Sequence, residues 1–243
     1  MRGSGTEAGG RDLWVFGYGS LMWHPGFEHA EAVHARLTGW HRCFCIWSVV
    51  YRGTPVRPGL VLGLDRGGVC EGIALRVPSA RASGVLAYLR RREQVTGVYR
   101  EALVPVSLAT EDRTEVMAVA YLAEPAHPGY AGDLPLKVQA ELIRGGHGRS
   151  GPNIDYCVST IDHLRALGIR EPRLERLRAV LGPLLARIPS RSRGARSGNA
   201  PTSPLPAFAA KRFVRLTPGE RRRFVHRRVL GAADATNGRR RSG

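Results

Sequence analysis

The chain has 243 residues, and its 43% hydrophobic and 23% charged residues are close to the averages of globular proteins. This composition excludes wholesale disorder, and no run of about 18 apolar residues is present to form a membrane-spanning helix. The net charge of +17 is unevenly distributed: residues 187–243 carry 15 Lys and Arg against two acidic residues, which leaves 22 against 18 in residues 1–186. Nucleic acid is therefore not expected as a partner of the nearly neutral body of the chain.

The N-terminal residues and the cysteines give expectations about the location of the protein. The first 11 residues are rich in glycine and lack the apolar core of a secretory signal. The four cysteines form no CxxC pair and no disulfide-framework spacing. We therefore expect a reduced, cytoplasmic protein that does not bind a membrane.

The first half of the chain has the patterns of β-strands. An apolar run over residues 13–16 ends at Gly17, which predicts a buried strand that enters a loop, and residues 33–50 predict a bent strand or two. Two hairpins are predicted: residues 60–64 and 70–77 flank the turn signal Asp65-Arg-Gly-Gly68, and residues 103–108 and 116–122 flank the polar segment 110–114.

Helices dominate the second half. One helix interrupts the strands, with Ser79 as its expected N-cap and Gly97 as its stop after about Thr96. Three more helices are predicted, over residues 136–144, 154–167 and 174–188. This order favours an α+β fold in which a mostly antiparallel or mixed sheet can close into a barrel, rather than a doubly wound alternation of strands and helices.

The first candidate site directly follows the first strand. It consists of Phe16, Gly17, Tyr18, Gly19, Ser20 and Leu21. Glycines on both sides of a tyrosine allow a sharp turn that exposes backbone N–H groups to a carboxylate or phosphate, and the serine adds a hydroxyl group. Because Met22 stands where a dinucleotide fingerprint requires its third glycine, that fingerprint is incomplete. A purely structural turn is the alternative.

The second candidate is Glu93, which continues an apolar stripe formed by Ala82, Leu86 and Leu89. A carboxylate on an apolar helix face is costly unless it is paired or functional. Burial would also raise its pKa from roughly 4.3 toward the range of a useful base. The alternative is a frayed helix end at which Glu93 pairs with a neighbouring arginine.

The third candidate is the glycine-rich segment 146–153, which leads into a predicted helix. Asn153 is a natural N-cap, and the N-terminus of the helix would favour an anionic ligand, although a surface loop is the alternative. No metal-ligand spacing connects the histidines at 24, 29, 34 and 41. The chain also lacks a GxSxG elbow, a Walker loop and an HExxH motif.

Taken together, these segments resemble the ChaC-like γ-glutamylcyclotransferases. The resemblance rests on five segments in the family's order: Trp14–Phe27, Gly39–Phe44, Tyr51–Pro55 with Pro58-Gly59, Arg92–Tyr99 and His147–Tyr156. The joint occurrence of the five segments is far more specific than any one of them. They span about residues 13–182, and the basic tail lies outside the resemblance.

The resemblance implies a small mixed β-barrel flanked by helices and a carbon–nitrogen lyase activity. The implied enzyme cleaves glutathione into 5-oxoproline and cysteinylglycine without a metal or cofactor. The family's catalytic glutamate falls on Glu93 and its substrate-binding loop on residues 16–21, and Tyr156 and Asn153 are placed near the pocket. Arg42 also falls in a family segment, where substrate binding and support of the fold both stay open.

Two other functions remain open. The chain could be a cyclotransferase for other γ-glutamyl amines or amino acids. Alternatively, it could bind nucleic acid or another anion through its tail, where Thr217-Pro-Gly-Glu220 resembles a capping box before a short basic helix. We expect a disordered N-terminus over residues 1–11, a catalytic domain over 12–188, and a largely disordered, Arg-rich tail over 189–243 with a short helix at 218–230. The oligomeric state stays open.

Overall fold

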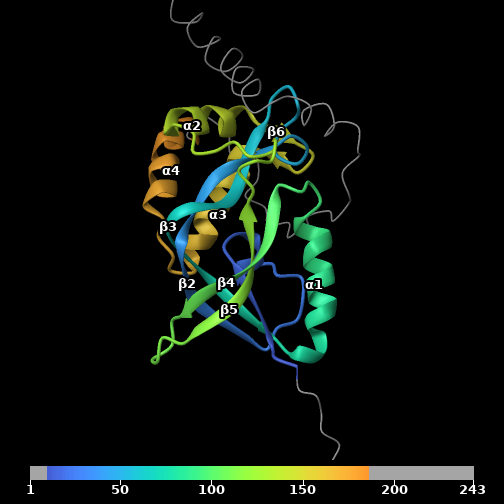
Figure 1. Ribbon diagram of the computed structural model, residues 1–243. Coiled ribbons are helices and arrows are strands. Elements are labelled where there is room, and N and C mark those ends of the chain that lie inside the picture. Colours follow the sequence, from blue (N-terminus) through green and yellow to red (C-terminus); the bar gives the residue numbers. More distant parts are fainter. Residues whose placement is uncertain (1–9, 186–243) are drawn as a thin grey trace, which may run out of the picture. The chain divides into compact units, whose positions relative to one another are not determined.

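The computed structural model describes residues 10–185 (Figure 1). The larger strands are β1 (Leu13–Gly17), β2 (Glu31–Ser48), β3 (Gly59–Val77), β4 (Tyr99–Leu108) and β5 (Glu115–Ala123). The helices are α1 (Ser79–Glu93), α2 (Leu136–Gly145), α3 (Asn153–Ala166) and α4 (Pro172–Leu185), together with the short 3-10 helix η1 (Ser20–Met22). A two-stranded ribbon, β6 (His147–Gly148) and β7 (Gly151–Pro152), precedes α3. The expected disordered N-terminus, apart from residues 10 and 11, and the expected tail with its helix at 218–230 lie outside the described residues.

The five larger strands form a closed barrel in the order β1-β3-β2-β4-β5. Strand β1 runs antiparallel to β3, with Leu13 opposite Val77, and parallel to β5, with Trp14 opposite Ala118. Strand β2 is antiparallel to β4. The barrel is therefore mixed, and the prediction of an α+β fold with a small mixed barrel and helices is confirmed.

One of the two predicted hairpins is wrong. Residues 65–68 do not reverse the chain, because β3 continues through them. Gly67 and Gly68 do adopt the positive φ values of +91° and +74° that a tight turn would need. In the barrel, however, β3 lies between β1 and β2, so the two glycines distort a continuous strand instead of joining two strands. The second hairpin is confirmed: β4 and β5 are neighbours, and the N–H of Leu108 donates to the carbonyl of Thr114.

All four predicted helices are present, and each one begins at a proline. Pro78, Pro135 and Pro152 immediately precede α1, α2 and α3, and Pro172 is the first residue of α4. Pro78, Pro135 and Pro152 are N-cap residues in an extended conformation, with ψ of 142–143°. Only Pro172 stands at the first helical position, where its missing N–H leaves no donor unsatisfied. The expected N-cap at Ser79 is therefore wrong: Ser79 is the first helical residue, and its N–H donates to Asp12 Oδ1.

Two compact units make up the chain. Of the described residues, the first contains 10–42, 64–95 and 99–122, so it holds β1, η1, α1, β4 and nearly all of β5. The second contains described residues 43–63, 96–98 and 123–185, and in it α2, α3 and α4 pack against one another. Strands β2 and β3 each contribute residues to both units. Within residues 10–185, no helix is long and apolar enough to span a membrane.

Candidate active site

The glycine-rich loop of the first unit leaves backbone donors available. Residues 16 and 17 end β1, and the chain then turns at Gly19 into η1. The N–H of Met22 donates back to the carbonyl of Gly19, as expected for a 3-10 turn. Within residues 10–185, the N–H groups of Gly19, Ser20 and Leu21 have no protein acceptor, because the first turn of a helix offers none. Ser20 is exposed, so this end of η1 can receive an anionic group from solvent.

Hydrogen bonds of two side chains, Tyr18 and Arg42, hold this loop in place. The hydroxyl of Tyr18 donates to the carbonyl of Tyr121 at 2.9 Å. Arg42, which is only 1% exposed, donates from Nε to the carbonyl of Tyr18 and from Nη2 to the carbonyl of Glu71. These contacts are to backbone groups of the protein itself. They favour support of the loop, and not substrate binding, as the role of Arg42.

Glu93 is the last residue of α1, three residues before the helix end that the sequence predicts. Its side chain is 21% exposed, and its Oε1 lies 3.0 Å from Nε of Arg92. Burial raises the pKa of the Glu93 carboxyl, and the neighbouring guanidinium partly opposes this rise. Both interpretations of Glu93 therefore apply: its carboxylate lies on the buried side of the helix, and it pairs with a neighbouring arginine. The buried side itself is formed by Val85 and Leu89.

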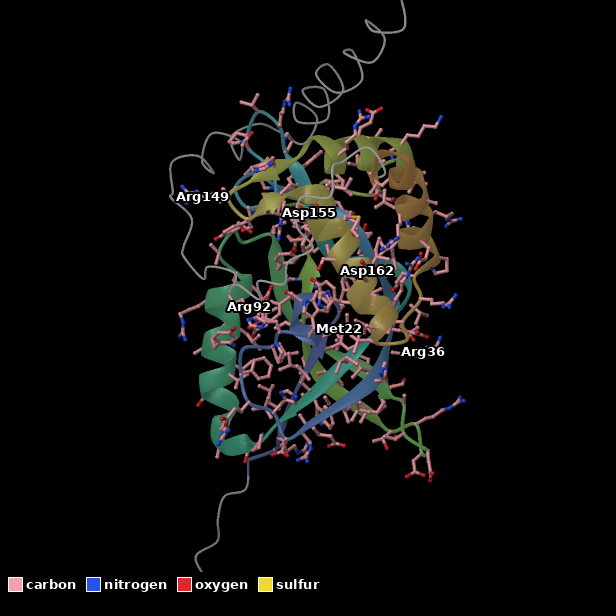
Figure 2. All side chains as sticks on the ribbon, turned by 180° about the vertical axis from the view of Figure 1, so that it is seen from behind. Met22, Arg36, Arg92, Arg149, Asp155 and Asp162 are labelled. Atoms are coloured by element: carbon pink, nitrogen blue, oxygen red, sulfur yellow. The ribbon has the colours of Figure 1, made fainter. Side chains whose placement is uncertain are left out.

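Arg92, which Figure 2 labels at the end of α1, contacts both Glu93 and the glycine-rich loop. Its Nη2 donates to Ser20 Oγ at 3.0 Å, and its Nη1 donates to the carbonyls of His24 and Pro25 at 2.8 and 2.9 Å. Within the first unit, the structure thus brings together Glu93 and the loop that the sequence predicts. No sequence pattern assigned a role to Arg92. A signal was available, because Arg92 stands four residues after Tyr88, the spacing of neighbours on a helix face, and Nη1 also donates to the hydroxyl of Tyr88 at 3.1 Å.

A second residue that the sequence did not reveal is Tyr121 on β5. Its hydroxyl donates to Oε2 of Glu101 at 3.1 Å, and Arg90 of α1 binds both oxygens of Glu101. Burial, the charge and hydrogen bond of Glu101, and the charge of Glu93 raise the pKa of Tyr121 well above its usual range. Tyr121 therefore stays protonated at physiological pH, and it is close enough to Glu93 for the two groups to interact electrostatically.

The expectation that Asn153 caps a helix is wrong. Its side chain lies in the second unit, where Oδ1 accepts the N–H of Leu60 at 2.7 Å and Nδ2 donates to the carbonyl of Leu60 at 2.8 Å. The amide offers one donor and one acceptor, which matches the backbone groups of a strand residue. Helix α3 begins after Pro152 without a side-chain cap, so the fully buried Asn153 instead joins the start of α3 to β3.

Tyr156 also lies in the second unit. Its hydroxyl accepts the N–H of Leu62 at 3.5 Å, the guanidinium of Arg52 lies 5.2 Å from the ring centroid, and Phe44 packs edge-on against the ring. Burial raises the pKa of Tyr156 to about 12. Tyr156 is thus a neutral phenol held by two neighbouring side chains, and its expected role in substrate binding stays a prediction.

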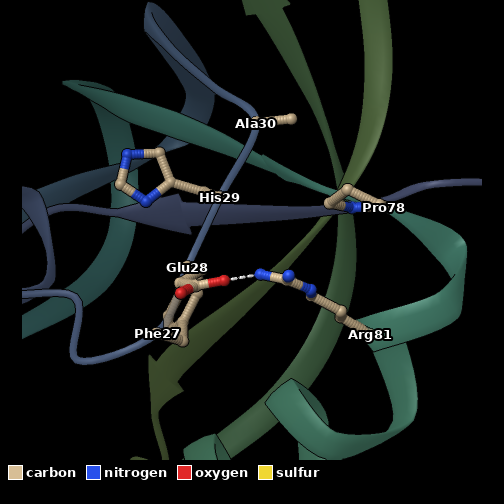
Figure 3. A pocket seen from close by; sticks show the side chains of 6 residues that line it. All are labelled: Phe27, Glu28, His29, Ala30, Pro78 and Arg81. Atoms are coloured by element: carbon tan, nitrogen blue, oxygen red, sulfur yellow. Dashed lines mark ion pairs between the residues drawn. The ribbon is translucent and has the colours of Figure 1, made fainter.

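The first unit also has an open groove of about 760 Å³, which other residues line (Figure 3). Its lining residues are Phe27, Glu28, His29, Ala30, Pro78 and Arg81. Glu28 and Arg81 form an ion pair across it. None of the site residues that the sequence predicts lines this groove, so it is not the candidate active site.

Comparisons with known proteins identify the relatives of this chain. The model of the family described as "ChaC-like protein" matches residues 13–182. A glutathione-specific γ-glutamylcyclotransferase of Escherichia coli strain K12 is 37% identical over 174 residues, which are 72% of this chain and 74% of the relative. The glutathione-specific γ-glutamylcyclotransferase 1 of Mus musculus is 34% identical over 177 residues, or 71% and 79% of the two chains. The crystal structure of a γ-glutamyl cyclotransferase specific to glutathione from yeast has a TM-score of 0.64 at 22% identity, over 72% of this chain and 97% of that chain, and so shares the fold.

Proposed function

Since the chain belongs to the ChaC-like protein family, we propose that it is a glutathione-specific γ-glutamylcyclotransferase, a lyase that converts glutathione into 5-oxoproline and cysteinylglycine. The relatives from Escherichia coli and Mus musculus carry that specificity in their names. One structural observation carries the proposal: the partly buried carboxylate of Glu93 and the glycine-rich loop at Ser20 are held by the same arginine side chain.

The nucleophile in this reaction belongs to the substrate. The α-amine of the γ-glutamyl group attacks its own γ-carbonyl carbon, and a five-membered ring closes through a tetrahedral intermediate. The amide bond to the cysteine nitrogen then breaks, and that nitrogen leaves as an amine after it gains a proton. Correct orientation of such an intramolecular attack corresponds to effective molarities on the order of 10⁵ to 10⁸ M. The protein therefore has to fold the substrate and move protons, and the reaction involves no change of oxidation state.

Glu93 is proposed to move those protons. The α-ammonium group has to lose a proton before it can attack, and the departing cysteinylglycine nitrogen has to gain one. A single carboxylate near both nitrogens can accept the first proton and donate it later. The raised pKa of Glu93 supports this role, because a carboxyl whose pKa lies nearer to neutral pH is a stronger base and can return its proton more easily.

The loop over residues 16–21 is proposed to bind the substrate's charged end. The N–H groups of Gly19, Ser20 and Leu21 are suited to hold the α-carboxylate or the oxyanion of the intermediate. Tyr156 is proposed as a further substrate-binding residue on the strength of the family resemblance. A cytoplasmic location is part of the proposal, and the four cysteines, which are all buried thiols, are compatible with a reducing compartment.

Product analysis tests the function directly. The purified protein should convert reduced glutathione into equal amounts of 5-oxoproline and cysteinylglycine. Glutamate in place of 5-oxoproline would indicate hydrolysis and contradict the mechanism. If glutathione gives no product while γ-glutamyl-ε-lysine or γ-glutamyl-alanine does, the chemistry stands but the substrate is a different γ-glutamyl amine.

The role of Glu93 gives a mutational prediction. Glu93→Gln removes the proton acceptor but keeps the size of the side chain, so we expect turnover of glutathione to fall by roughly 10² to 10⁴-fold. The rate of 5-oxoproline formation measures this loss. Glu115→Gln is the matched control, because Glu115 is an exposed residue of the same unit. Near-wild-type turnover by Glu93→Gln would show that another group moves the protons.

A further inference from the structure

The ion pair between Arg92 and Glu93 is unusual because the two residues are adjacent in a helix. Side chains at neighbouring helix positions point about 100° apart and do not normally meet. Here α1 ends at Glu93, and Gln94 has left the helical conformation with φ −95° and ψ 14°. Both residues lie in the last turn of α1, and Oε1 of Glu93 is nevertheless 3.0 Å from Nε of Arg92. The ion pair therefore brings together two side chains that helix geometry alone would direct apart.

The remaining nitrogens of Arg92 bind the loop segment. Nη2 reaches Ser20 Oγ, and Nη1 reaches the carbonyls of His24 and Pro25. All three nitrogens of the guanidinium are thus engaged, and the side chain is only 17% exposed. An arginine can make these contacts together because its donors have a fixed planar arrangement, whereas a lysine offers a single nitrogen.

The surroundings of Arg92 are built to hold this geometry. Tyr88, one helical turn earlier, accepts a hydrogen bond from Nη1. The segment that passes over it needs a glycine at position 26, which has φ +77°, and a Cβ there would lie 2.0 Å from the Tyr88 hydroxyl oxygen. Phe27 then packs edge-on against the Tyr88 ring. The Tyr88 hydroxyl, the glycine at position 26 and the ring of Phe27 therefore together restrict the guanidinium to one position.

We propose that Arg92 is a positioning residue that joins the Ser20 loop to the Glu93 carboxylate. In this role it holds the substrate-binding loop and the proton-transferring group at a fixed separation and favours the ionised form of Glu93. The proposal rests on the proposed function for its kinetic consequences. Its geometric basis, the contacts of one guanidinium with both groups, does not depend on that function.

The charge of Arg92 has a defined effect on the pH dependence. Within residues 10–185, the titratable groups that interact with Glu93 are Arg92 on its own helix and Tyr121 on β5. The Glu101 partner of Tyr121 is itself paired with Arg90. Burial raises the pKa of Glu93, and Arg92 lowers it. Removal of the guanidinium therefore raises that pKa further. Because a base works only when it is deprotonated, activity would then require a higher pH.

Two variants of Arg92 and one control test the proposal. We expect Arg92→Gln to shift the acid limb of the kcat/KM profile upward by about 1 pH unit and to raise KM for glutathione roughly 10-fold, a change of about 1.4 kcal/mol. Arg92→Lys keeps a positive charge but loses the planar arrangement of guanidinium donors. KM for glutathione should therefore rise, while the acid limb of the kcat/KM profile should move less than in Arg92→Gln. Arg91→Gln removes the charge of an exposed neighbour in the same helical turn and should change neither quantity.

The outcomes separate this proposal from the function. If wild type turns over glutathione and Arg92→Gln leaves both KM and the acid limb unchanged, the positioning role is overturned and the function stands. If wild type acts on no γ-glutamyl amine, the function fails, and ¹³C NMR titration of the Glu93 carboxyl still decides: an unchanged pKa in Arg92→Gln overturns the role of Arg92. If Arg92→Gln does not fold, Arg92→Lys replaces it, and an unchanged KM in that variant overturns the proposal.

Discussion

Glu93 is subject to two opposing effects, and burial outweighs its arginine partner. The guanidinium of Arg92 stabilises the carboxylate, but removal from water destabilises it by more, so the pKa of Glu93 lies above its usual value. The position at the C-terminal end of α1 acts in the same direction as burial, because the helix dipole disfavours a negative charge there. An ionised Glu93 therefore lowers the stability of the folded protein at neutral pH.

The destabilisation caused by ionised Glu93 can be measured as a pH-dependent difference in stability between Glu93→Gln and wild type. Since the pKa of Glu93 is higher in the folded than in the unfolded protein, the folded state binds more protons and loses stability as pH rises through this range. We expect the free energy of unfolding of Glu93→Gln, relative to wild type, to increase as pH rises from about 4, the pKa of an unperturbed glutamate, through the raised pKa of the folded state. Urea denaturation at a series of pH values measures it. A difference that is flat or that decreases with pH would contradict the raised pKa.

At the scale of elements, the second unit depends on the connection between α3 and β3. The side-chain amide of Asn153 bonds both the N–H and the carbonyl of Leu60, as the backbone of a neighbouring strand would. Arg52 donates to the carbonyl of Ser150 in the segment before α3. Glycine at 148 is required there, because a Cβ would lie 2.5 Å from the carbonyl of Tyr51. The bond from Arg52 to Ser150 joins two of the segments on which the family resemblance rests, and the Asn153 bonds join one of those segments to Leu60 of β3.

Truncation of the amide should therefore weaken the fold. In Asn153→Ala the N–H and carbonyl of Leu60 lose their partner in a buried position, and each unsatisfied group costs about 1–3 kcal/mol. We expect the midpoint of urea denaturation to fall accordingly. Ser159→Ala on the exposed side of the same helix is the control and should have a small effect. If Asn153→Ala is as stable as that control, the amide is not a structural connection.

At the scale of the whole molecule, the family match and the cluster of basic residues lie in different parts of the sequence. The match ends at residue 182, and residues 187–243 contain 15 of the 37 basic residues. The division into a catalytic domain over 12–188 and a basic tail remains a prediction. The site residues and the tail's charges therefore belong to different parts of the sequence, and their contributions can be measured separately.

Removal of residues 189–243 tests this separation. We expect the shortened chain to keep its kcat/KM for glutathione, because no site residue is removed. Any retention of the full chain on an RNA column should decrease with salt, since phosphate contacts release counterions, and should be absent from the shortened chain. Loss of glutathione turnover on truncation would show that the tail belongs to the catalytic part.

The sequence predicted those features that depend on local patterns. Apolar runs and periodicity located residues of all five barrel strands and of the four helices, although they divided β3 into two strands, and they placed a glycine-rich turn directly after β1. The error at Gly67 and Gly68 arose because positive φ values suit both a turn and a distorted strand, and pairing with distant strands decides between them. The contact between Arg92 and Ser20 joins residues that are 72 positions apart, so no local pattern reveals it.

The proline at the start of each helix has a consequence for how the protein responds to its solvent. Many helices depend on an aspartate or another polar side chain to satisfy their first N–H groups, and a carboxylate cap weakens in acid or high salt. Pro135, Pro152 and Pro172 fix the backbone through the covalent ring instead, and they restrict the unfolded chain as well. This covalent restriction at the beginnings of α2, α3 and α4 does not change with pH or ionic strength, unlike the contribution of acidic residues such as Asp155 and Glu175 in the first turns of α3 and α4.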